Sequence, residues 1–157
     1  MSTTVSTPPD IVRSAYAELV VTSLEQARWF WVDLVGFFLT AEEPDALYLR
    51  GCEELTHHNL VLRLGAEPAL SHLAYRVRSA RDLDRAESHG VAAGCRVRRV
   101  EAGLTRGVGP AVRVEDPLGF VVEYFHEIER PERLTQRYDL RHGAEPARLD
   151  HFNLVVS

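Results

Sequence analysis

The sequence repeats one strand-like pattern three times, and this repetition constrains the fold more than any other feature. In each copy, apolar residues alternate with small or polar ones, which is typical of a half-buried β-strand. The copies lie at residues 15–21, 71–77 and 148–157. A sequence period of roughly sixty residues predicts one supersecondary unit per copy. We therefore expect two complete units and the opening strand of a third.

The first unit, residues 11–66, is predicted to be a strand, a helix and then further strands. Ser23 and Gln26 have the spacing of a capping box, in which each side chain satisfies a free backbone N–H at the start of a helix. Apolar residues follow at helical spacing until Gly36, which suits a helix end. The predicted elements are a strand at 14–21, a helix behind Ser23, a short strand near 37–40, and strands at 46–50 and 58–64.

The second unit, residues 69–128, repeats this order. Its helix starts at residues 79–82 and is predicted to be short, because Gly90 and Gly94 interrupt the helical pattern. The sequence Asp-Pro-Leu-Gly at residues 116–119 is a strong turn signal. The predicted strands of this unit lie at 71–78, 95–100, 111–115 and 120–126.

These units define a fold class and a division of the chain. We expect an α+β fold in which two βαβββ modules form a curled mixed sheet. Residues 1–10, rich in Ser, Thr and Pro, are expected to be a flexible leader. Residues 11–128 form the expected domain of two modules, the charged and partly helical residues 129–148 a connector, and residues 149–157 the first strand of a further, truncated domain. That strand would expose unpaired backbone, so we expect it to be disordered or to add to a neighbour's sheet edge.

The composition excludes several classes of function. A length of 157 residues suffices for one proper core, and a net charge of −5 gives no reason to expect nucleic acid or an anionic membrane as a partner. The longest apolar runs are too short to cross a bilayer. Cys52 and Cys95 form no Cys-x-x-Cys motif, and no signal peptide is recognisable, which favours reduced thiols in a cytoplasmic protein.

Two side chains of the second module could converge on a metal. Because alternate residues of a strand share a face, His72 and Glu123 would approach each other if both strands lined the concave side of the sheet. An Fe(II) site of the two-His-one-carboxylate kind needs one more imidazole. The first module offers Tyr16 and Glu18 instead, and the missing His occurs only at His151. A buried hydrogen-bonded pair of His72 and Glu123 is the simpler alternative, and the carboxylate is expected to find Tyr16, His72 or an Arg.

Long segments of the chain resemble a known family. They are AELVV (17–21), RWFWVD (28–33), YLRG (48–51), THHNLVLR (56–63), VEDPLGF (114–120), LTQRYDL (134–140) and RLDHFNLV (148–155). On these segments, the sequence is similar to the N-terminal half of the type I extradiol ring-cleavage dioxygenases of the vicinal oxygen chelate superfamily, which shares its fold with glyoxalase and bleomycin-resistance proteins. Within that family it resembles the 3,4-dihydroxyphenylacetate (homoprotocatechuate) 2,3-dioxygenases.

The resemblance implies a role for particular residues. Family members have four modules, and their catalytic Fe(II) or Mn(II) lies in the C-terminal domain. His151 matches the first metal ligand, the other two ligands belong to the module absent here, and Asn153 matches a position that lines the active site. By internal repetition, Tyr16, His72 and Glu123 fall on vestigial ligand positions. Residues 11–128 are thereby the N-terminal vicinal oxygen chelate domain.

The resemblance also implies a function for the intact protein. It is expected to be an oligomeric oxidoreductase of aromatic compound catabolism, with a catechol and O₂ as substrates, while the present chain alone binds no metal tightly and is inactive. Two alternatives remain: a self-contained glyoxalase-like or bleomycin-resistance-type metalloenzyme, and a metal-free module that binds an aromatic ligand. His57 and His58 are interpreted as a strand edge or subunit contact. Arg96, Arg98 and Arg99 are interpreted as a solvated or interface strand rather than an anion site.

Overall fold

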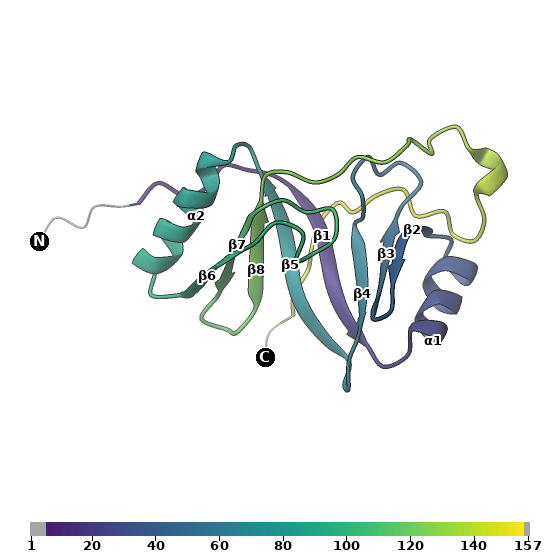
Figure 1. The fold of residues 1–157 in the computed structure, drawn as a ribbon, viewed down its shortest axis with the longest axis horizontal. Coiled ribbons are helices and arrows are strands. Elements are labelled where there is room, and N and C mark those ends of the chain that lie inside the picture. Colours follow the sequence, from purple (N-terminus) through teal and green to yellow (C-terminus); the bar gives the residue numbers. More distant parts are fainter. Residues whose placement is uncertain (1–5, 156–157) are drawn as a thin grey trace, which may run out of the picture. The chain divides into compact units, whose positions relative to one another are not determined.

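The computed structural model describes residues 6–155, and within them the strands and helices follow the predicted order (Figure 1). The first module contains β1, α1, β2, β3 and β4, and the second contains β5, α2, β6, β7 and β8. The elements are β1 (Ile11–Val21), α1 (Leu24–Arg28), η1 (Trp29–Leu34), β2 (Phe38–Glu43), β3 (Ala46–Arg50), β4 (Leu60–Leu64), β5 (Ala69–Val77), α2 (Arg81–Ala92), β6 (Arg96–Val100), β7 (Ala111–Glu115), β8 (Val121–Phe125) and η2 (Tyr138–Leu140).

The strands form a mixed sheet. Among the described residues, the hydrogen-bonded order is β2-β3-β4-β1-β5-β8-β7-β6. β1 and β4 pair in parallel, whereas β2 with β3, β3 with β4, β6 with β7 and β7 with β8 pair antiparallel. The predicted α+β class with two βαβββ modules is therefore confirmed.

The chain divides into two compact units that largely follow the modules. Of the described residues, one unit contains 14–73 and 129–155, and the other contains 6–13 and 74–128. Each unit has its own apolar core, as burial of apolar surface requires. The core of the first is Ala27, Leu47, Leu49, Leu60 and Leu62, and the core of the second is Val77, Leu83, Ala86 and Val112.

The first helix begins as predicted but changes type. The Ser23 hydroxyl accepts a hydrogen bond from the backbone N–H of Gln26 at 3.2 Å, so the Ser23 half of the predicted capping box is confirmed, while the reciprocal bond from Gln26 stays a prediction. After one α-helical turn the chain continues as a π-helix, in which the N–H of Val35 bonds the carbonyl of Phe30. Gly36 follows with a φ of +94°, which a glycine adopts without strain.

The second helix is longer than predicted. α2 runs for 12 residues and passes through Gly90 without a break. A Cβ atom at Gly90 would lie 2.8 Å from Val97 and 3.1 Å from Val114. The predicted interruption at Gly90 is therefore wrong, because this glycine lets the helix pack closely against the strands. Gly94, with a φ of +74°, follows the helix end.

The C-terminal segment differs from the expectation in its local structure. The connector contains one short 3-10 helix, η2, and residues 149–155 form no strand in the described part of the chain. The segment instead runs back along its own unit: the N–H groups of Cys52 and Glu53 donate to the carbonyls of Pro146 and Ala147. The predicted strand needs a pairing partner, and the described residues supply none. Residues 156 and 157 lie outside the described residues.

None of the helices in residues 6–155 combines the length and apolar character that a membrane span requires.

Candidate functional site

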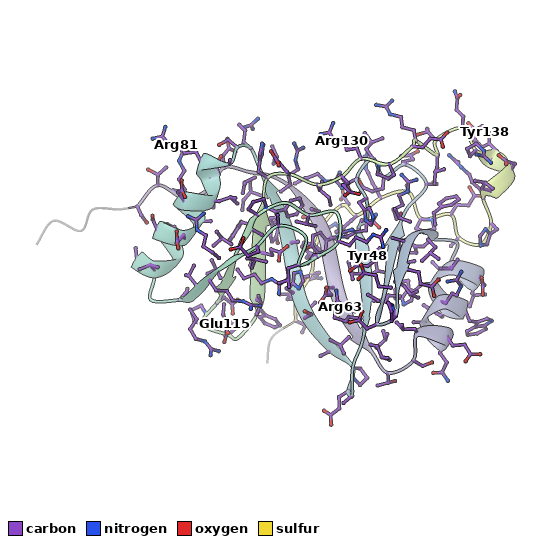
Figure 2. The ribbon with its side chains drawn as sticks, viewed as in Figure 1. Tyr48, Arg63, Arg81, Glu115, Arg130 and Tyr138 are labelled. Atoms are coloured by element: carbon purple, nitrogen blue, oxygen red, sulfur yellow. The ribbon has the colours of Figure 1, made fainter. Side chains whose placement is uncertain are left out.

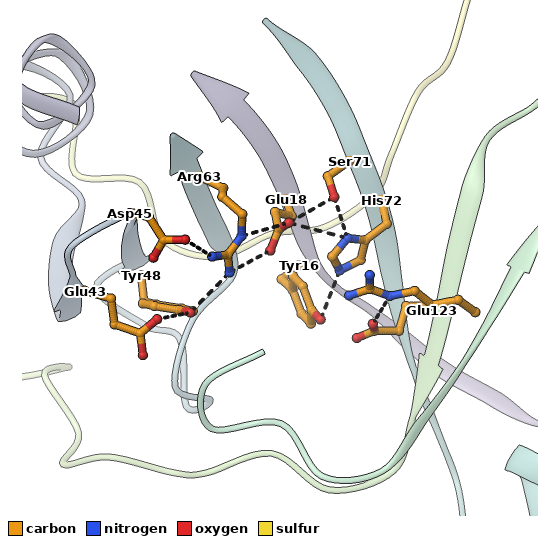
Figure 3. A network of polar contacts seen from close by, with 10 residues as sticks. Tyr16, Glu18, Glu43, Asp45, Tyr48, Arg63, Ser71, His72 and Glu123 are labelled. Carbon is orange, nitrogen blue, oxygen red and sulfur yellow. Dashed lines mark hydrogen bonds and ion pairs between the residues drawn. The ribbon is translucent and has the colours of Figure 1, made fainter. Parts of the chain in front are cut away.

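A network of largely buried polar side chains links β1 and β5 in the unit that holds residues 14–73 (Figure 3). Tyr48 and Arg63, which extend this network, are labelled among all the side chains in Figure 2. His72 and Tyr16 are both fully buried, and 3.2 Å separates the His72 Nε2 atom from the Tyr16 hydroxyl. On the other side of the imidazole, Nδ1 lies 3.1 Å from the Ser71 hydroxyl, which donates to Glu18 at 2.9 Å. Two of the predicted site residues, Tyr16 and His72, are therefore brought together.

These contacts fix the protonation of a neutral His72. The single Ser71 proton is directed to Glu18, so the Ser71 oxygen accepts from the protonated Nδ1 of His72. The unprotonated Nε2 atom then accepts a hydrogen bond from the Tyr16 hydroxyl. The one lone pair with which this imidazole could bind a metal is thus already occupied.

Glu18 extends the network toward β3 and β4. Its carboxylate receives hydrogen bonds from Arg63, at 3.2 Å through Nε, and Arg63 also contacts the Tyr48 hydroxyl, which donates to Glu43 (Figure 3). Burial is the largest single influence on the pKa of Arg63 and lowers it, but the charge and hydrogen bonds of Glu18 together with the Tyr48 hydroxyl raise it by more, so the net pKa lies above its ordinary value. Burial raises the pKa of Tyr48. The network therefore places the Tyr48 phenol, whose pKa is raised, beside the ion pair of Arg63 and Glu18.

Glu123 lies in the other unit, on β8 (Figure 3). Its side chain is 1% exposed, and Arg113 donates from Nε to its carboxylate at 2.6 Å. The expectation that this buried carboxylate finds an Arg is confirmed. A direct pair with His72 stays a prediction.

His57 and His58 precede β4 and are buried, so their interpretation as a strand edge or subunit contact is wrong. Their Nδ1 atoms lie 2.9 Å apart, and the His58 ring packs edge-on against Tyr16, with 4.5 Å between the ring centres. Burial lowers the pKa of His58 well below its usual value, and the positive charges that His57 and His72 would carry lower it further. The polar sequence around them gives no signal of this burial.

His151 and Asn153 lie in the C-terminal segment, and both are exposed. The side chain of His151 is 77% exposed, and its Nδ1 atom lies 3.2 Å from the carboxylate of Asp150. Within residues 6–155, no group of three or more His, Cys, Asp or Glu side chains is arranged to hold a metal ion. The described residues therefore do not fit a two-His-one-carboxylate centre by themselves.

A cavity of about 210 Å³ lies under the C-terminal segment, within the unit that holds residues 14–73. Its lining is mostly apolar, and Asn59 and Arg148 are its polar members. Aromatic rings contribute much of the wall, and two of them, Trp31 and Phe37, pack edge to face. The lining residues are Ala17, Trp31, Phe37, Asn59, Leu60, Arg148, Leu149 and Phe152.

Comparisons with known proteins agree with this fold. Residues 70–129 match the family described as catechol 2,3-dioxygenase-like N-terminal domain. The structure matches homoprotocatechuate 2,3-dioxygenase from Arthrobacter globiformis with a TM-score of 0.91 and 52% identity, over 96% of this chain and 47% of that one. It matches the Brevibacterium fuscum enzyme, solved with 3,4-dihydroxyphenylacetate, with a TM-score of 0.91 and 50% identity, over 94% of this chain and 46% of that one.

A curated relative gives the same result from sequence. Manganese-dependent 2,3-dihydroxybiphenyl 1,2-dioxygenase from Geobacillus genomosp. 3 is 29% identical over 92% of this chain and 49% of its own length. The chain thus spans about half the length of the relatives that it matches. The chain is similar to extradiol dioxygenases, and its residues 70–129 match their catechol 2,3-dioxygenase-like N-terminal domain.

Proposed function

We propose that this chain is the N-terminal, non-catalytic half of an extradiol dioxygenase, and that it supports a catalytic half to which it contributes His151. The observation that carries the proposal concerns His72 and Glu123, which correspond by internal repetition to metal ligands of the catalytic half. Both side chains are already bonded to other side chains of this chain. Tyr16 hydrogen-bonds the free nitrogen of His72, and Arg113 holds the carboxylate of Glu123. A metal ion at His72 would have to displace Tyr16, and a metal ion at Glu123 would have to displace Arg113; both partners are buried or nearly so.

In the intact protein, we propose that His151 is the first ligand of Fe(II) or Mn(II) and that two further ligands come from residues outside this chain. Such a metal would bring a catechol and O₂ into one coordination sphere. His151 suits this role because its ring is exposed and Asp150 accepts a hydrogen bond from Nδ1, which leaves Nε2 free for coordination. Asn153 is proposed to line the same site.

The proposed substrate is 3,4-dihydroxyphenylacetate or a similar catechol. The solved relatives that match at 50% and 52% identity are homoprotocatechuate 2,3-dioxygenases, and one of them was solved with that compound. We also propose that the intact protein forms a homo-oligomer. The residues that select the ring substituent are proposed to lie in the catalytic half.

A chimera tests this proposal directly. This chain would replace the matching half of the Arthrobacter globiformis enzyme, and the product would be assayed with Fe(II) or Mn(II), O₂ and 3,4-dihydroxyphenylacetate. We expect the chimera to form the yellow ring-opened product and the 157-residue chain alone to form none. In the chimera, His151→Ala is expected to lower kcat at least a hundredfold, because it removes a metal ligand.

Tyr16→Phe is the matched control, because it removes only a hydroxyl from the vestigial position. The chimera with this substitution should keep its kcat within about threefold, since Tyr16 touches no substrate in this proposal. Turnover by the chain alone would contradict the proposal. So would a loss of activity with Tyr16→Phe as large as that with His151→Ala.

A further inference from the structure

The arginines of the outer strand β6 lie in two different environments. Alternate residues of a strand face opposite sides, so Arg96 and Arg98 share one face and Val97 and Arg99 the other. Val97 packs into the core beneath α2, and Arg99 forms ion pairs of 2.5 and 2.6 Å with two acidic residues of α2. Arg96 and Arg98 therefore lie on the face of this unit that α2 does not cover.

The strand register places like charges opposite each other on this face. Arg98 pairs with Arg113 across β6 and β7, and Arg113 pairs with Glu123 across β7 and β8. The Glu123 carboxylate is held by Arg113, and Glu115 is held by Arg96. Each carboxylate of this patch is thus engaged by another arginine. Among residues 6–155, Arg98 has neither an ion pair nor a hydrogen bond from its guanidinium.

This arrangement lacks one negative charge. Like charges directly opposite each other on neighbouring strands destabilise a sheet, and Arg113 is only 11% exposed, so solvent screens it little. Three arginines face two carboxylates here, although the whole chain carries a net charge of −5. An oxyanion between Arg98 and Arg113 would remove the repulsion and give Arg98 the bidentate partner that its guanidinium favours.

The patch also contains space for such a group. A cavity of about 190 Å³ is lined by Arg96, Val97, Arg98, Arg113, Glu115 and Val121. Three of these residues are the arginines described above. Val121 gives the wall an apolar side chain on the same face as the arginines, against which an apolar substituent of the anion could pack.

We propose that Arg98, flanked by Arg96 and Arg113, binds a small oxyanion, a carboxylate or a phosphate, in this cavity. This proposal departs from the interpretation of the β6 arginines as a solvated or interface strand for Arg98, whereas Arg99 is paired with acidic residues of α2. The site lies within one unit and uses none of the residues assigned to the metal or to the catechol in the proposed function.

The test measures binding of inorganic phosphate and of phenylacetate by calorimetry and by the thermal midpoint, with NaCl added to hold the ionic strength constant. Arg98→Gln is expected to weaken the binding of at least one probe by about tenfold or more, because a charged hydrogen-bond donor is lost. The affinity of the Arg98→Lys variant should lie between those of the parent chain and the Arg98→Gln variant, since lysine keeps the charge but not the bidentate geometry. Without any anion, Arg98→Gln should unfold at a higher temperature than the parent chain, because the repulsion with Arg113 is gone.

Arg99→Gln is the matched control, one residue away and on the opposite face, and it should change the affinity less than twofold. Equal affinities in the parent chain and the Arg98→Gln variant would overturn the proposal, as would the absence of saturable binding of both probes. A third overturning result is that neither probe binds while Arg98→Gln changes the oligomeric state. In that case Arg98 would form an ion pair with an acidic side chain of a second copy of the chain, at an interface along the edge strand β6.

Discussion

At the scale of single residues, Glu18, His72 and Glu123 are each held by neighbours in their own unit, whereas the buried Nε2 atom of His58 has no hydrogen-bond partner among the described residues. Arg113 neutralises Glu123, Arg63 neutralises Glu18, and Tyr16 and Ser71 hold both nitrogens of His72. Groups of this kind are costly to bury without partners. Each of these groups therefore stabilises the folded chain only as long as its bonding partner is present.

Replacing Glu123 tests how strongly burial determines the stability that one such ion pair contributes. Glu123→Ala leaves Arg113 charged and nearly buried, so we expect the free energy of unfolding to fall by about 3–5 kcal/mol. Glu115→Ala is the control: it breaks an ion pair with the exposed Arg96 on the neighbouring strand and should cost at most about 1 kcal/mol. Urea denaturation measures both. Equal losses would show that burial does not decide the energy of these pairs.

The buried His58 gives stability a defined pH dependence. Its pKa is lowered in the folded chain, so below the ordinary value of about 6.5 the unfolded chain binds more protons than the folded one. The contribution of this residue is present above that pH and is lost as the pH falls. We expect the free energy of unfolding to decrease by up to about 1.4 kcal/mol per pH unit below pH 6.5 for this single group.

His58→Asn should reduce this slope between pH 6.5 and 5.5 relative to the parent chain. Chemical denaturation at a series of pH values gives the comparison. The same slope in the parent chain and the His58→Asn variant would assign the pH dependence to other groups.

At the scale of secondary-structure elements, the sequence predicts regular strands well and close packing poorly. The strands at 46–50 and 111–115 begin and end where their alternation predicts. The π-helix and the unbroken α2 were not predictable, because each depends on what the element packs against. Gly90 is the clearest case: local propensity predicts a helix break, whereas the approach of Val97 and Val114 requires a glycine within the helix.

Gly90→Ala separates these two effects. Alanine improves helix propensity by about 1 kcal/mol, but its Cβ would lie 2.8 Å from Val97, and overpacking costs about 1–3 kcal/mol. We expect a net loss of about 1 kcal/mol in urea denaturation. Val97→Ala should cost less in the Gly90→Ala background than alone, because it removes the clash. Strict additivity of the two substitutions, or a gain from Gly90→Ala alone, would refute the packing explanation.

At the scale of the whole molecule, internal repetition predicts the two βαβββ modules, and the structure and its relatives confirm them. The site was less predictable. The burial of His57 and His58 depends on residues distant in sequence, such as Tyr16, and no local pattern records it. The division of a catalytic site between the present residues and the rest of a longer protein also cannot be derived from spacing. That division is inferred instead from the comparisons, in which this chain covers only about half the length of each relative.

Metal content is the most direct test of the central claim that this chain does not form a complete metal centre. The purified 157-residue chain would be dialysed to equilibrium against Fe(II) without oxygen, and separately against Mn(II), and its bound metal determined by elemental analysis. Because His72 and Glu123 are occupied by Tyr16 and Arg113, we predict far less than one tightly bound ion per chain. One tightly bound ion per chain that is lost in His72→Ala would contradict the account.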